Sequence, residues 1–76
     1  MSITTWMQVK RLRDLLDVDG LTEEDKSNIE MAIDLLEQTE NPFARRVAIT
    51  ILKRTANKNT YVADIIGHIT KELDNV

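Results

Sequence analysis

The stretch NPFARRVAITILKRTANKNTYVADIIGHITKELD, residues 41–74, decides the fold because it holds two helical patterns joined by a short polar break. Asn41 suits the N-cap of the first helix, and Pro42 suits its first position, where a missing N–H costs nothing. Apolar residues then recur at helical spacing on both sides of NKNT, residues 57–60. Helices joined by so short a loop pack side by side, so the stretch predicts an antiparallel hairpin.

The first helix of this hairpin is apolar around much of its circumference. Its main apolar stripe comprises Phe43, Val47, Ala48, Ile51, Leu52 and Ala56. Ile49 lies away from that stripe, so we expect this helix to be the most buried of the fold. We expect Phe43 in the core.

The second helix of the hairpin begins after Asn59 or Thr60, either of which is a suitable cap. Its apolar stripe comprises Val62, Ile65, Ile66, Ile69 and Leu73. Gly67 lies inside this helix, and a glycine there often indicates close contact with a neighbouring backbone.

Two further helical patterns precede the hairpin. The first follows Thr4 or Thr5 as cap and carries Trp6, Val9, Leu12, Leu15 and Leu16. The second starts at Thr22, where TEED resembles a capping box with Asp25 in the acidic position. Its stripe comprises Ile29, Ala32, Ile33, Leu35 and Leu36. We expect an all-α fold, a compact bundle of four short helices forming a single domain over residues 1–76.

The segment DVDGLTEEDK, residues 17–26, has the look of a calcium-binding loop. An EF-hand loop needs oxygen ligands at positions 1, 3 and 5, glycine at 6 and glutamate at 12. With Gly20 at position 6, position 1 is Leu15 and position 12 is Lys26, and neither side chain supplies a carboxylate. The first helix ending at Gly20, which takes a left-handed conformation without a Cβ penalty, and a new capping box explain the same residues, so we predict no metal site.

Charge is unevenly distributed along the chain. Residues 41–63 carry five basic residues and no acid, whereas residues 14–40 carry ten acids and one lysine. The candidate contacts for an anionic partner are Arg45, Arg46, Lys53, Arg54 and Lys58. Such a line of cations suits successive phosphates, although the few aromatic residues argue against a binder of single strands. The alternative is that these cations are solvated or pair with the acidic second helix.

The first helix offers a candidate apolar contact, Trp6 with Met7, followed by the cations Lys10, Arg11 and Arg13. Aromatic, methionine and arginine side chains are favoured at protein interfaces. The alternative is that Trp6 closes one end of the bundle core. Exposure of both Trp6 and Met7 would favour a surface for a partner.

Catalytic machinery is not recognisable in the sequence. His68 is the only histidine, no serine or cysteine accompanies it in a nucleophile arrangement, and the chain has no cysteine. No glycine-rich phosphate loop is present, and no apolar run approaches the length of a membrane span. We therefore expect no enzymatic activity, no cofactor, no membrane partner and a cytoplasmic location.

The chain length, the all-helical pattern and RRVAITILKRTANKNTYVADIIGHITKELDNV, residues 45–76, resemble the small accessory proteins of T4-like phages, among them the short protein encoded beside the recombination helicase UvsW. The resemblance implies a role near phage DNA recombination, repair or replication in the host cytoplasm, as the partner of a helicase. It rests on no diagnostic motif, so it transfers no functional residue.

These observations together predict a non-enzymatic accessory or adaptor protein that acts by binding another macromolecule. A protein is the expected partner, and the resemblance suggests a DNA-processing enzyme. The alternative is direct binding of single-stranded or duplex DNA through the basic stripe of the third helix.

Overall fold

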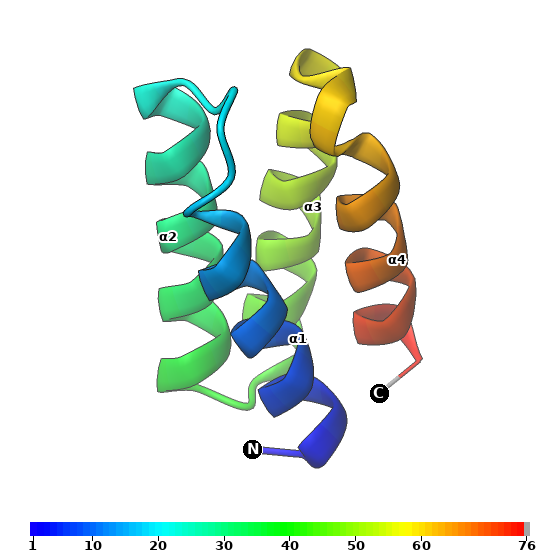
Figure 1. Cartoon of the computed structure of the whole chain (residues 1–76). Helices are drawn as coiled ribbons and strands as arrows, with labels where there is room; N and C mark the ends of the chain where they lie inside the picture. Colours follow the sequence, from blue (N-terminus) through cyan, green and yellow to red (C-terminus); the bar gives the residue numbers. More distant parts are fainter. Residues whose placement is uncertain (76) are drawn as a thin grey trace.

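The computed structural model describes residues 1–75, which form a bundle of four α-helices (Figure 1). The helices are α1 (Ile3–Leu15), α2 (Glu23–Gln38), α3 (Pro42–Lys58) and α4 (Ala63–Asp74), and a short 3₁₀ helix, η1 (Thr60–Val62), leads into α4. No strand occurs within residues 1–75, which confirms the predicted all-α class. The predicted antiparallel hairpin of α3 and α4 is also confirmed, since the two helices pack together along the bundle.

The four helices form a ring in which each packs against two neighbours. α1 packs on α2 and α4, and α3 packs on the same two helices, so α1 and α3 lie across the ring from each other. They therefore occupy a diagonal of the bundle (Figure 1). As a consequence, the outer face of α1 and the outer face of α3 point in opposite directions.

The core lies along the axis of this ring and is built almost wholly from aliphatic side chains. Every helix contributes at least one apolar side chain with no exposed surface: Leu12, Ile29, Ala32, Ala48, Leu52, Ile66, Ile69 and Leu73. Val62 of η1 is equally buried, so the turn before α4 belongs to the core as well.

Three helix starts show how local sequence places the elements. The capping box predicted at the start of α2 is present, with Thr22 and Asp25 each accepting from the other's backbone N–H. Asn41 caps α3 ahead of Pro42, as predicted. The predicted cap of α1 is wrong, because the helix starts earlier and Ser2 accepts from the N–H of Thr5.

The predicted burial of α3 needs correction. α3 buries four of its 17 residues and α4 buries four of its 12, so α3 is not the most buried helix. Ile49 is 5% exposed and belongs to the core, whereas Phe43, expected there, is 72% exposed. The side facing the bundle is the one with Ala48, Leu52 and Thr55, and Phe43 lies on the opposite side of the helix.

The two glycines also differ from expectation. Gly20 does not end α1, whose C-cap is Leu16; it lies within the following loop with φ of +96°. Gly67 was expected to allow close backbone contact, but a Cβ placed there would meet nothing within 4 Å. Because Gly67 lies on the exposed side of α4, the prediction of a close neighbour is wrong.

Candidate interaction surfaces

A polar network joins the α1–α2 loop to the junction of α3 with η1. The Asn59 side-chain amide donates to Oδ2 of Asp25 at 3.0 Å and to the carbonyl of Gly20 at 3.1 Å. Its carbonyl oxygen accepts from the N–H of Tyr61. Asp25 is 4% exposed, and the Asn59 amide together with bonds from Thr22 holds the pKa of its carboxyl below the usual value.

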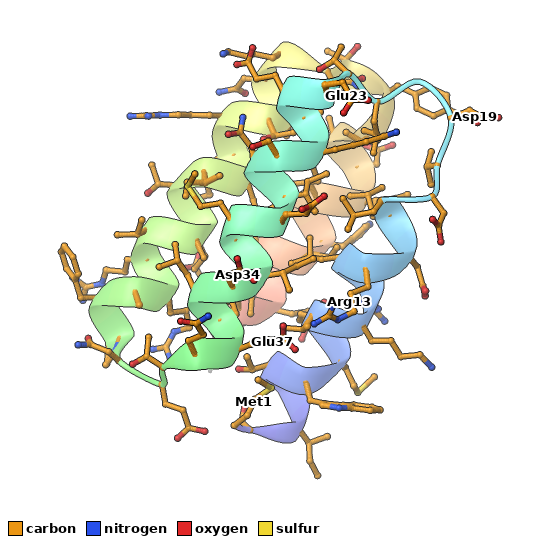
Figure 2. The ribbon with its side chains drawn as sticks, turned by 90° about the vertical axis from the view of Figure 1, so that its left-hand side faces the viewer. Met1, Arg13, Asp19, Glu23, Asp34 and Glu37 are labelled. Atoms are coloured by element: carbon orange, nitrogen blue, oxygen red, sulfur yellow. The ribbon has the colours of Figure 1, made fainter. Side chains whose placement is uncertain are left out.

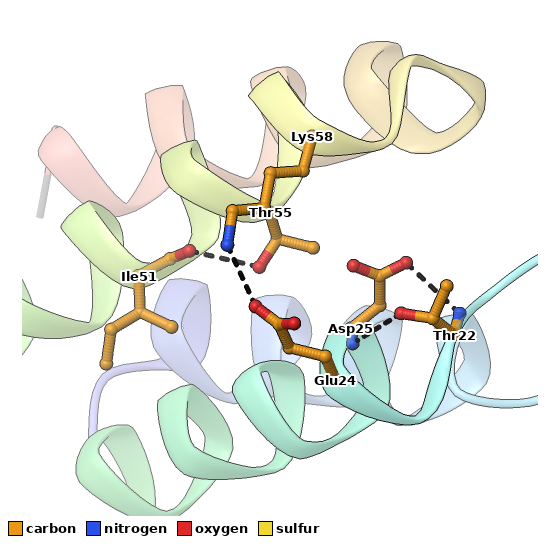
Figure 3. A network of polar contacts seen from close by, with 6 residues as sticks. All are labelled: Thr22, Glu24, Asp25, Ile51, Thr55 and Lys58. Atoms are coloured by element: carbon orange, nitrogen blue, oxygen red, sulfur yellow. Dashed lines mark hydrogen bonds and ion pairs between the residues drawn. The ribbon is translucent and has the colours of Figure 1, made fainter.

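Figure 3 shows the same region, with an ion pair joining α2 and α3 beside the capping box of Thr22 and Asp25. Nζ of Lys58 donates to the Glu24 carboxylate at 2.8 Å, and this bond raises the pKa of Lys58. Both side chains are exposed, so the pair adds little stability. Of the acidic residues in the segment 17–26, Glu24 and Asp25 therefore have structural partners in this network.

The aspartates of the α1–α2 loop do not gather around a common point. Asp17 and Asp19 are both exposed, and Figure 2 shows Asp19 at the outer edge of the loop, away from Glu23. In the part of the chain that the structure describes, no group of three or more His, Cys, Asp or Glu side chains is arranged to hold a metal ion.

The outer face of α1 exposes large apolar side chains. Trp6 is 59% exposed, Met7 is 44% exposed and Ile3 is 79% exposed. Trp6 therefore does not close the bundle core, and Trp6 and Met7 are exposed together. We call the surface formed by Ile3, Trp6, Met7, Lys10 and Arg11 the α1 face.

Shallow grooves flank the α1 face on both sides. Trp6 and Lys10 line the groove toward α2, and Arg11 lines the groove toward α4 together with Ile65. Ile65 was expected in the core of α4 but is 47% exposed, so it adds an exposed apolar side chain to the groove that Arg11 lines. Of the cations on α1, Arg13 pairs with Glu37 across the α2 side (Figure 2).

Lys10 and Arg11 carry charge that no ion pair within residues 1–75 neutralises. Neither forms an ion pair within residues 1–75, and Arg11 makes only a long bond of 3.4 Å to Gln8. Residues 1–13 contain no acid. The α1 face therefore combines an apolar end with a cationic end.

The outer face of α3 carries the predicted basic stripe. The alternative that its cations pair with the acidic α2 holds for Lys58 alone: Arg45, Arg46, Lys53 and Arg54 form no ion pair among the residues described. Arg46, Lys53 and Arg54 are exposed, and Arg45 is half-buried beside Ser2 and Thr5. The structure thus groups three of the five predicted cations on one free face and sets Arg45 and Lys58 apart.

Phe43 adds an aromatic side chain to this basic stripe, which the sequence did not reveal. A shallow groove on the outer side of α3 is lined by Phe43, Arg46, Val47, Thr50, Ile51 and Arg54. The one available signal was the position of Phe43 in the first turn of α3, directly after Pro42.

His68 lies on the surface rather than in a catalytic arrangement. It is exposed and shares a shallow groove with Arg11, Ile65, Ile69 and Glu72. No serine is among the residues lining that groove.

No protein-family model, no curated protein and no solved structure matches this chain. No helix within residues 1–75 combines the length and the apolar character that crossing a bilayer requires. The outer faces of α1 and α3 are therefore the candidate functional surfaces of this chain.

Proposed function

We propose that this chain is a non-enzymatic accessory protein that acts by binding another protein through the α1 face. The observation that carries the proposal is the joint exposure of Trp6 and Met7 on one outer face of a helix. Tryptophan buries a large apolar area when a partner covers it, and tryptophan with arginine is typical of the residues that dominate interface energies. The resemblance to accessory proteins of T4-like phages suggests that the partner is a DNA-processing helicase in phage DNA recombination or repair.

The test is a pull-down from host lysate, with and without nuclease, using the wild-type chain and the double variant Trp6→Ala, Met7→Ala. The expected result is a captured protein that survives nuclease treatment and is lost with the double variant. Met31→Ala is the matched control, because Met31 is 50% exposed but lies on α2. Equal capture by the wild type and the double variant would refute a role for the α1 face.

A second candidate function is direct binding of nucleic acid through α3. It is favoured by the three exposed cations without ion pairs and by Phe43, whose exposure removes the objection that α3 lacks an aromatic surface for bases. The cations contact phosphates, and Phe43 stacks on a base at the end of the stripe.

A salt titration of fluorescent single-stranded and duplex oligonucleotides tests this second function. Arg46→Ala and Lys53→Ala should each weaken binding and lower the slope of log affinity against log salt by about 1. Lys71→Ala is the control, because Lys71 is exposed on α4. An absence of binding at low salt, or equal loss with Lys71→Ala, would exclude α3 as a nucleic-acid surface.

A further inference from the structure

We infer that the α1 face docks an acidic amphipathic helix of the partner protein, an inference that rests on the proposed function. The apolar end of the face indicates a helix. Ile3 precedes Trp6 by three residues and Met7 by four, so the three side chains form one cluster a single turn long. An apolar stripe on a second helix, with its own three- and four-residue spacing, packs against such a cluster.

The cationic end indicates the charge of that helix. Lys10 and Arg11 both lie one turn beyond Met7, and Arg11 lies on the side of α4. Both lack an ion pair within the described chain, whereas Arg13 is already held by Glu37. Carboxylates on a docked helix form ion pairs with Lys10 and Arg11, whereas cations at the same positions are repelled by them.

The acidic residues near the α1 face limit where the acidic residues of the docked helix can lie. Asp14 follows Lys10 by one turn, and Glu72 shares the groove with Arg11. Glu37 lines the groove with Lys10 but is already paired with Arg13. The acids of the partner therefore lie over the middle of α1 rather than beyond it. From Ile3 to Arg11 the helix rises about 12 Å, which corresponds to two to three turns of a docked helix.

The apolar side chains of the α1 face favour an amphipathic helix over a nucleic acid as the ligand. Ile3 and Met7 offer methyl and thioether groups to which a phosphate backbone has no complement. The basic stripe of α3 points the opposite way, so nucleic acid bound there leaves the α1 face free.

The experiment uses the intrinsic fluorescence of Trp6, the only tryptophan of the chain. The probe is a synthetic peptide of about five helical turns with leucines at positions i, i+3, i+4 and i+7 of each repeat and glutamates elsewhere; a control peptide carries lysines in place of the glutamates. The glutamate peptide should shift the Trp6 emission to shorter wavelength in a saturable manner, with amide chemical-shift changes concentrated on α1 and the adjoining side of α4. The lysine peptide should bind about tenfold more weakly or not at all.

Charge-reversal variants test the cationic end separately from the apolar end. The double variant Lys10→Glu, Arg11→Glu should lower the affinity for the glutamate peptide by about tenfold and raise that for the lysine peptide. Lys53→Glu, on α3, should leave both affinities unchanged. Equal binding of the two peptides, no saturable shift, or chemical-shift changes on α3 would overturn the inference.

Two further outcomes are decisive. A saturable shift with vesicles of phosphatidylglycerol but not with the glutamate peptide would overturn the inference in favour of an anionic lipid surface. If the glutamate peptide fails while Trp6→Ala, Met7→Ala still abolishes nuclease-resistant capture, the inference falls and the proposed function stands. If the peptide binds at the α1 face but capture is unaffected by that variant, the proposed function falls instead.

Discussion

The junction beside Asn59 and the outer face of α1 satisfy their side chains in opposite ways. At the junction, one asparagine side chain bonds to Gly20, Asp25 and Tyr61. Within residues 1–75 no buried side-chain nitrogen or oxygen lacks a hydrogen-bond partner. On the α1 face, by contrast, Trp6 is 59% exposed and Met7 is 44% exposed. The fold thus satisfies the hydrogen bonds of its buried polar side chains but leaves large apolar side chains exposed on one face.

The largest expected effect is the difference in the free energy of unfolding between a substitution in the core and one on the α1 face. Leu52→Ala removes a side chain with no exposed surface and should lower the free energy of unfolding by about 2–5 kcal/mol. Trp6→Ala should change it by less than about 0.5 kcal/mol, because the side chain is 59% exposed. Urea unfolding followed by circular dichroism measures both. A loss with Trp6→Ala as large as that with Leu52→Ala would show that Trp6 stabilises the bundle.

The next effect concerns the junction itself. Asn59→Ala removes three hydrogen bonds and leaves the buried Asp25 carboxylate with fewer donors, so it should destabilise the fold by about 1–3 kcal/mol. Asn57→Ala is the matched control, because Asn57 is exposed on α3. Thermal unfolding of the two variants gives the comparison, and equal melting temperatures would mean that the network adds no stability.

The two glycines should respond to alanine with opposite signs. Gly20→Ala places a Cβ at a φ of +96° and should cost about 1–2 kcal/mol. Gly67→Ala should stabilise the fold by about 0.5–1 kcal/mol, since it removes helix-interior glycine where nothing lies within 4 Å. Chemical denaturation of both variants tests the pair. Destabilisation by Gly67→Ala would indicate a close neighbour on that side of α4.

The smallest effect is a dependence on pH. Because the pKa of Asp25 is lowered in the folded state, its carboxylate stabilises the fold at neutral pH, and this contribution is lost as the pH falls below about 4. Asp25→Asn should therefore be less stable than the wild type at pH 7, with a difference that shrinks in acid. Urea midpoints from pH 7 to pH 2.5 measure this difference. Asp34→Asn, at an exposed site on α2, should show no such trend; the same trend there would refute the role assigned to Asp25.

The candidate surfaces were only partly predictable. The sequence supplied Trp6 and Met7 as one pair and Arg46, Lys53 and Arg54 as one stripe, because residues three and four apart share a helix face. It left open whether Trp6 closed the core, and it misplaced Phe43. Neither could be decided locally, because an apolar side chain is buried only if another helix covers its side of the turn.

What the sequence determined by itself was local: the helical spacing of apolar residues, the capping box at Thr22 and Asp25, and the break between α3 and α4 all follow from interactions within a few residues. What only the tertiary structure decided was which apolar side chains a neighbouring helix covers. Each helix has two neighbours in the ring, so Ile49 entered the core while Phe43 and Ile65 were left at the surface. The pairing of Asn59 with Asp25, 34 residues away, was decided in the same way, because the packing of α3 against α2 brings the end of α3 to the start of α2.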